Sequence, residues 1–140
     1  MKKYLLIFLF LFGSAQAAEL KIRFIQLDFK GGNLLVNIFN NEDGFPDDPD
    51  KAYFSEVYEL KNGVSYYDVI IPNLPEGKYG ISVVQDLNRN NKLDKNLFGV
   101  PREPIGFSQN PRLKRTIDFS EVLFELPSAG MTQTVVLRPI

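Results

Sequence analysis

Hydrophobic and polar residues alternate along much of this chain, a two-residue period typical of β-strands with one buried face. Leu20, Ile22 and Phe24 alternate with Lys21 and Arg23, so this segment has one apolar and one charged face. No window of ten or more residues carries the stripe of an amphipathic helix. Further segments with a strand pattern lie at residues 33–39, 53–60, 65–71, 78–85, 121–126 and 132–138.

Turn signals separate these segments and indicate the fold class. Gly31-Gly32 precedes the second segment, and Lys61-Asn62-Gly63 between the third and fourth contains the Asn-Gly pair typical of a β-hairpin. Residues 40–50 hold two Pro, one Gly and five acidic residues, which favours a loop. About seven short strands with such turns predict an all-β fold, an antiparallel β-sandwich of the Ig-like or transthyretin-like kind.

A tight turn before the fifth segment supports this prediction. The string Leu74-Pro75-Glu76-Gly77-Lys78-Tyr79 looks like the start of a late strand in transthyretin-like and carboxypeptidase-regulatory-like sandwiches. We expect Tyr79 to bury its ring while its hydroxyl bonds to backbone across the corner. The strand that begins here ends at Gln85, directly before the most distinctive segment of the chain.

The N-terminus has the layout of a secretory signal peptide. Lys2 and Lys3 precede an apolar run at residues 4–12, and Ala15-Gln16-Ala17 provides small residues for cleavage after Ala17. We therefore expect residues 1–17 to be removed and residues 18–140 to form one exported domain, periplasmic or secreted. The apolar run has nine residues, well short of the ~20 that span a bilayer, so we expect no membrane span.

Charge and composition restrict the possible functions. Residues 1–17 hold two of the sixteen basic residues and none of the seventeen acidic ones, so the mature chain has a net charge of −3, which argues against nucleic-acid binding. The chain contains no His and no Cys, which removes the usual general base, thiol nucleophiles, His-containing zinc sites and disulfides. These absences favour a protein that is not an enzyme.

The segment from Asp86 to Asp94 carries oxygen-bearing groups at alternate positions and resembles the first nine positions of a calcium-binding loop. Position 6, where such a loop turns sharply, is Asn91, the non-glycine type that best tolerates a left-handed conformation. The predicted ligands at positions 1, 3, 5, 7 and 9 are the side chains of Asp86, Asn88 and Asn90, the backbone carbonyl of Lys92, and the side chain of Asp94.

Position 12 of the calcium-loop pattern, which should supply a bidentate Glu, is Leu97. Glu103 is the nearest downstream carboxylate and is the candidate that folds back to replace it. Two carboxylates and two amides predict weak Ca²⁺ binding, near the millimolar class of extracellular modules. Two alternatives remain: Asx-turns in a metal-free structural domain of the envelope, or a small hydrolase or polymer-modifying enzyme that uses Asp86, Asp94 and Glu103 as acid and base.

Residues 96–117 form the longest stretch without a strand pattern. Their apolar content is too high for a disordered segment, so we expect an ordered loop that folds onto the sandwich, with calcium at its entrance. Phe98, Arg102 and Phe107 are candidates for a surface that contacts an envelope partner or a glycan. The alternative for the two Phe residues is that they anchor the loop.

Together, these motifs resemble the bacterial extracytoplasmic family known as domain of unknown function 2141. The most specific part runs from Gln85 to Asn110 and includes Leu97-Phe98-Gly99-Val100-Pro101-Arg102-Glu103-Pro104-Ile105-Gly106-Phe107-Ser108. Gln85 and Asn91 stand where the family commonly has His and Gly. The resemblance covers essentially the whole mature chain and implies a sandwich fold and an extracytoplasmic location, without an activity.

Overall fold

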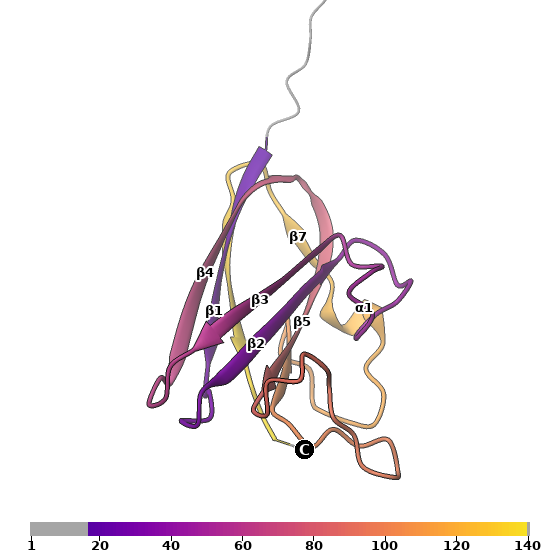
Figure 1. The fold of residues 1–140 in the computed structure, drawn as a ribbon. Coiled ribbons are helices and arrows are strands. Elements are labelled where there is room, and N and C mark those ends of the chain that lie inside the picture. Colours follow the sequence, from indigo (N-terminus) through magenta and orange to yellow (C-terminus); the bar gives the residue numbers. More distant parts are fainter. Residues whose placement is uncertain (1–16, 140) are drawn as a thin grey trace, which may run out of the picture.

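The computed structural model describes residues 17–139, which form two β-sheets packed face to face as a sandwich (Figure 1). One sheet has the order β4-β1-β8; in the other the order is β3-β2-β5-β6, and β7 also pairs with β5. The predicted all-β sandwich is thus confirmed. The elements are β1 (Ala17–Ile25), β2 (Gly32–Phe39), β3 (Phe54–Leu60), β4 (Tyr66–Pro75), β5 (Gly77–Asp86), β6 (Ile105–Phe107), α1 (Phe119–Val122), β7 (Phe124–Leu126) and β8 (Met131–Val136).

The two-residue period accounts for the main core. In β1 every second side chain, including Leu20, Ile22 and Phe24, is buried against the other sheet, while Lys21 and Arg23 face solvent. β2 and β5 contribute further buried aliphatic side chains to the same cluster. Residues 1–16 lie outside the described residues, and with them all of the predicted signal peptide except Ala17, where β1 begins.

One strand pairing departs from the antiparallel pattern. β8 runs parallel to β1, with Ile22 opposite Gln133 and Phe24 opposite Val135, whereas the other strand pairs are antiparallel. The parallel direction arises because the chain crosses from β7 on one sheet to β8 on the other before running beside β1. Alternation of side chains indicates which face is buried, but it carries no information on strand direction.

The predicted corner before β5 is present. Tyr79 is 3% exposed, and its hydroxyl donates a hydrogen bond to the carbonyl of Pro75 at 2.7 Å. This bond ties the start of β5 to the end of β4. β5 therefore begins from a fixed corner and carries the chain to Asp86 at the opposite end of the sandwich.

Two predicted boundaries need correction. The strand expected at residues 121–126 is the short helix α1 followed by the short strand β7, and α1 packs so closely on β5 that a Cβ at Gly80 would lie 2.7 Å from Val122 Cγ2. The loop expected at residues 96–117 contains β6, which pairs with β5. β6 has three buried residues and hence no alternation that could reveal it.

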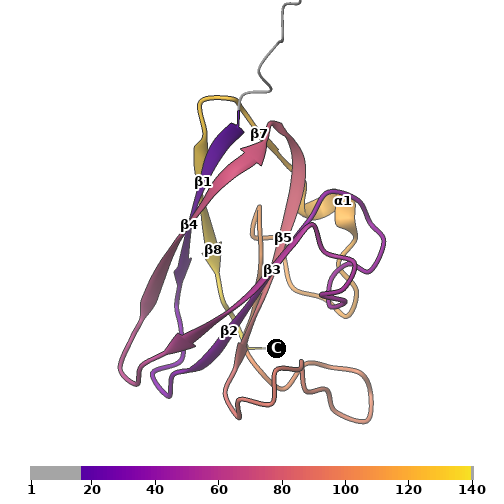
Figure 2. The same ribbon diagram turned by 45° about the horizontal axis from the view of Figure 1, so that its top comes forward.

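A second hydrophobic cluster covers the outer face of the five-stranded sheet. The segments before β3 and around α1 pack there (Figure 2). The later part of the predicted long loop, with Ile105, Phe107 and Ile117, folds onto the sandwich as expected, whereas Leu97 and Phe98 in its first part are exposed. The buried members of the cluster are Ile105, Phe107, Ile117 and Val122.

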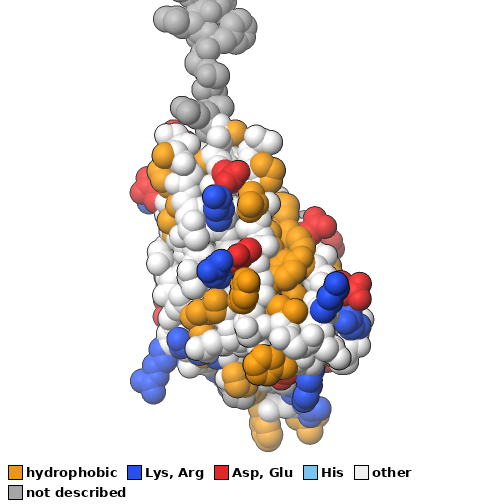
Figure 3. Space-filling model, turned by 90° about the vertical axis from the view of Figure 1, so that its left-hand side faces the viewer, with side chains coloured by type: hydrophobic (Ala, Val, Ile, Leu, Met, Phe, Trp, Pro, Cys, Tyr) orange, Lys and Arg blue, Asp and Glu red, His pale blue; other side chains and the backbone are white. Residues whose placement is uncertain are grey.

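The outer face of the three-stranded sheet is open to solvent, and acidic and basic side chains lie there among apolar ones (Figure 3). Arg23 pairs with Asp68 on this face at 2.7 Å. No helix within residues 17–139 is long and apolar enough to cross a membrane.

Candidate cation loop at the end of β5

Asp86 is the last residue of β5 and is completely buried. Its carboxylate accepts hydrogen bonds from the backbone N–H groups of Asn90 at 3.3 Å and Asn91 at 2.6 Å. The neighbouring backbone is held close, because Gly32 has a φ of +88° and a Cβ there would lie 2.3 Å from the Asp86 carbonyl oxygen. The first predicted ligand is therefore fixed between the end of a strand and the turn of its own loop.

Three more predicted ligands converge at the other side of the loop. Asn88 Nδ2 donates to Asp94 Oδ2 at 2.5 Å, and Asn90 Nδ2 donates to both Asp94 oxygens at 3.0 and 3.1 Å. The amide oxygens of Asn88 and Asn90 accept N–H groups within the loop, from Asn90 at 3.2 Å and Lys92 at 3.0 Å. Calcium binding at this point requires both amides to turn their oxygens, rather than their nitrogens, toward Asp94.

The turn of the loop has the expected backbone conformation. Asn91 has a φ of 59°, which lies in the left-handed region that position 6 of a calcium loop requires. Its amide oxygen accepts a hydrogen bond from Asn33 Nδ2 at 3.0 Å, which ties the turn to β2. The side chain of Lys92 is exposed, so only its backbone carbonyl belongs to the predicted ligand set.

Glu103 folds back onto the loop, as position 12 of the pattern would require. Its two carboxylate oxygens accept the N–H of Leu87 at 3.0 Å and the N–H of Asp94 at 3.2 Å, so one side chain joins both ends of the loop. Burial raises the pKa of the Glu103 carboxyl, as do the nearby charges of Asp86 and Asp94, while the two backbone hydrogen bonds act in the opposite direction. Glu103 is therefore close enough to Asp86 and Asp94 for their charges to act on its carboxyl.

These acidic groups do not form a metal centre built from carboxylates alone. Among residues 17–139, no group of three or more His, Cys, Asp or Glu side chains is placed to hold an ion. The predicted set is different in kind, because three of its six ligand residues contribute an amide or backbone carbonyl oxygen. The loop is closed, and its carboxylate oxygens accept hydrogen bonds from N–H groups.

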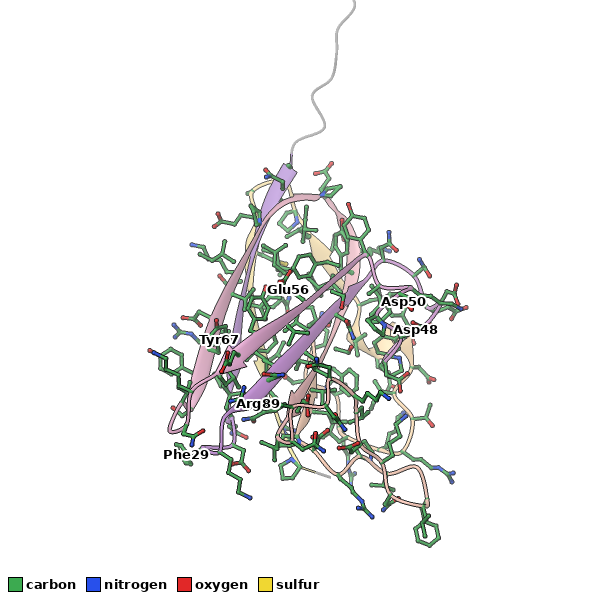
Figure 4. All side chains as sticks on the ribbon, in the orientation of Figure 1. Phe29, Asp48, Asp50, Glu56, Tyr67 and Arg89 are labelled. Carbon is green, nitrogen blue, oxygen red and sulfur yellow. The ribbon has the colours of Figure 1, made fainter. Side chains whose placement is uncertain are left out.

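Arg89 anchors this loop to the sandwich, and nothing in the local sequence indicates that role. Arg89 donates to Asn33 Oδ1 at 3.0 Å and to the carbonyl of Leu60 at 3.3 Å, and its guanidinium lies 3.4 Å from Glu59 (Figure 4). These contacts connect the loop to the ends of β2 and β3. Their partners are far from Arg89 in the sequence, so no local pattern could reveal them.

The segment from Asp94 to Arg102, here called the finger, projects beyond the sandwich. Its base is closed by the N–H of Arg102, which donates to the carbonyl of Asp94 at 2.8 Å, and by a β-bridge between Lys95 and Pro101. Its tip is a turn in which the Asn96 side chain accepts the N–H groups of Phe98 at 2.9 Å and Val100 at 3.0 Å.

The predicted contact residues have different environments. Phe98 is 78% exposed at the tip of the finger, and Arg102 is exposed at its base. Leu97, which occupies position 12 of the calcium-loop pattern, is 99% exposed beside Phe98. Phe107 is 5% exposed and belongs to the second hydrophobic cluster, so its prediction as a contact residue is wrong and the loop-anchoring alternative is correct.

Taken together, these features define a small β-sandwich domain with a structured loop and a projecting finger at one end. The chain belongs to a family of uncharacterized proteins conserved in bacteria, DUF2141, whose model matches residues 22–134. The match extends from β1 into β8 and so includes both sheets. No curated protein and no solved structure matches the chain.

Proposed function

We propose that this protein is an exported, non-catalytic binding module. In this proposal Ca²⁺ binds the loop at residues 86–94, Glu103 closes the site, and the ion fixes the finger that presents Leu97, Phe98 and Arg102 to a partner in the cell envelope. The observation that carries the proposal is the placement of Glu103, whose carboxylate reaches both ends of the loop. Glu103 lies outside the loop in the sequence, and in this proposal its carboxylate replaces the bidentate Glu that is absent from position 12.

The ion would act mechanically through Asp94. This residue is a predicted ligand, and its carbonyl also accepts the hydrogen bond that closes the base of the finger. Ordering a backbone residue costs about 1–2 kcal/mol, so an ion at the base offsets part of the cost of holding an exposed nine-residue hairpin. Loss of the ion should loosen the finger while the sandwich stays folded.

The tip of the finger suits a partner with an apolar recess. Leu97 and Phe98 are adjacent, and both are far more exposed than large apolar side chains normally are. An exposed aromatic side chain with an arginine nearby has the composition of a protein interface, where aromatic residues and Arg are enriched. We therefore favour an envelope protein over a glycan.

The environment of the acidic residues supports a non-catalytic role. The Asp86 and Glu103 carboxylates are buried and bonded to backbone N–H groups, and both Asp94 oxygens accept amide N–H groups. General acid–base catalysis needs a carboxyl within reach of a substrate proton. Export is supported by the charged, apolar and small-residue layout of residues 1–17.

The test is the thermal midpoint of the protein in millimolar Ca²⁺ and in EDTA, with Asp94→Asn as the variant. At a free Ca²⁺ concentration ten times Kd, linkage predicts a stabilisation of about 1.4 kcal/mol, which is a shift of several degrees for a domain of this size. Asp94→Asn should abolish most of the shift. In a parallel titration, the side-chain NH₂ signals of Asn88 and Asn90 should move, because their amides must turn.

Asp50→Asn is the matched control. Asp50 is exposed on the loop before β3, well away from the finger (Figure 4), and its removal changes the net charge by the same amount. Its Ca²⁺ response should equal that of the unmodified protein. A midpoint that does not respond to Ca²⁺, or an equal loss of response in both variants, would reject the calcium site.

The finger predicts a separate result for partner binding. The double variant Leu97→Ser/Phe98→Ser should unfold within about 0.5 kcal/mol of the unmodified protein, because both side chains are exposed. It should nevertheless lose the envelope proteins that the unmodified domain retains in Ca²⁺ and releases in EDTA. Retention of the same proteins by the double variant would show that the finger is not the contact surface.

A further inference from the structure

A cavity of about 210 Å³ lies on the outer face of the five-stranded sheet. Its walls come from residues 45–47, 93–101 and 114–117, and its floor comes from β5 and β6. The predicted calcium ligands do not line it. Its floor is apolar, with Val84 half-buried and Ile105 and Phe107 buried.

The rim of this cavity is basic. Lys95, Lys114 and Arg115 lie on it, together with one carboxylate, that of Asp47. Lys95 is paired with Asp47 at 2.9 Å, and Lys114 is paired with Glu121 at 3.0 Å. Within the part of the chain that the structure describes, Arg115 has no ionic partner.

The basic rim and the apolar floor indicate an amphipathic ligand, with an anionic end and an apolar body. A guanidinium without a carboxylate partner is suited to a planar anion, which it can hold through two parallel hydrogen bonds. The floor requires an apolar body. Ser82, which contributes a hydroxyl to the wall, already donates it to the Pro46 carbonyl at 2.6 Å.

The size of the cavity limits the ligand. At 210 Å³ it is smaller than the ~300–1,000 Å³ sites of drug-sized molecules. It has room for about seven water-sized volumes of about 30 Å³ each, and hence for an apolar body of about seven non-hydrogen atoms, with the charged end of the ligand on the rim.

We propose that this cavity binds a medium-chain fatty acid in its carboxylate form. The acyl chain lies on Val84, Ile105 and Phe107, and the carboxylate pairs with Arg115. The proposal is independent of the calcium site, because it uses other side chains. It concerns a binding site only, so no bond is made or broken.

The experiment titrates the folded protein with octanoate and with 1-octanol, which has the same chain length but no charge. Binding is followed by calorimetry and by backbone amide shifts. We expect one equivalent of octanoate to bind, with the largest shifts around Val84, Ile105 and Phe107, and about tenfold or more weaker binding of 1-octanol, as expected for loss of a charge-assisted contact. Arg115→Gln should weaken octanoate binding by a similar factor.

Arg112→Gln is the matched control, because Arg112 is an exposed arginine of the same segment that does not line the cavity. It should bind octanoate as the unmodified protein does. Equal affinity for octanoate and 1-octanol, equal effects of the two Arg variants, or shifts confined to the tip of the finger would each overturn the proposal. The two hypotheses fail separately. Octanoate should bind equally well in Ca²⁺ and in EDTA, because the cavity and the loop share no side chain, whereas a thermal midpoint that does not respond to Ca²⁺ rejects the calcium site alone.

Discussion

At the scale of single residues, buried polar side chains hold neighbouring segments together through hydrogen bonds. Gln85 is the clearest case. Its side chain is fully buried, accepts the N–H of Asp28 at 2.7 Å, and donates to the carbonyls of Asp28 and Gly31 at 2.8 Å. These bonds hold the β1–β2 connection against the strand that leads to Asp86. Gln85 therefore has a structural role in this domain.

Gln85→Leu should destabilise the domain by about 2–4 kcal/mol, because it leaves one buried N–H and two carbonyls without their partners. Denaturant unfolding measures the change. Gln109→Leu serves as the control: Gln109 is exposed and makes one hydrogen bond, to the carbonyl of Leu123, so its cost should stay within about 1 kcal/mol. Equal costs would show that the three bonds of Gln85 contribute little.

At the scale of single residues, the sequence predicted the parts of the site that depend on local chemistry. Asn91 was expected to adopt a left-handed conformation, and Tyr79 to bond across its corner, and both do. The contacts of Arg89 were not predictable, because their partners are distant in the sequence. Burial of Phe107 was one of the two alternatives stated for it, and the structure shows that one. The amide hydrogen bonds of Asn88 and Asn90 to Asp94 were outside what spacing alone can show.

At the scale of elements, the long strands with two-residue alternation were predictable and the short ones were not. β1, β2, β3, β5 and β8 lie close to their predicted ranges. β6 has three residues, all buried, and α1 has four, so neither is long enough to show a period. Both elements are fixed by contacts with β5 rather than by their own pattern.

The junction of β2 with the loop after β5 depends on Gly32, and Gly63 offers a matched comparison. Both have similar positive φ values, +88° and +85°, but a Cβ at Gly32 would lie 2.3 Å from the Asp86 carbonyl, whereas at Gly63 nothing lies within 4 Å. Gly63→Ala should cost about 1–2 kcal/mol from the backbone alone. Gly32→Ala should cost at least about 3 kcal/mol, because Asp86 must also move.

Denaturant unfolding of the two Gly variants gives the comparison, and Ca²⁺ titration adds a second readout. If Asp86 is a ligand, Gly32→Ala should weaken Ca²⁺ binding while Gly63→Ala should not. Two variants that lose the same stability would indicate that the backbone at Gly32 shifts without disturbing Asp86, and the close approach would then have no energetic role.

At the scale of the whole molecule, the last strand completes both sheets. β8 covers the edge of β1 and buries Val135 and Leu137 close to its end, and Arg138 exchanges two backbone hydrogen bonds with Ile105 in the other sheet at 2.9 and 3.0 Å. Each buried aliphatic side chain contributes about 1.5–3 kcal/mol. Small domains have net stabilities of only about 5–15 kcal/mol, so the sandwich should not survive without this strand.

A chain that stops at Gly130 should therefore lack cooperative unfolding and near-ultraviolet circular dichroism, and it should bind a dye specific for exposed apolar surface. A synthetic peptide of residues 131–140 should restore the cooperative transition by pairing with the free edge of β1. The same peptide with Val135→Asp should fail, because the charge would enter the core. If the shortened chain unfolds cooperatively by itself, the two sheets are held by β1 to β7 alone, and the parallel strand is an addition to a domain that is already complete.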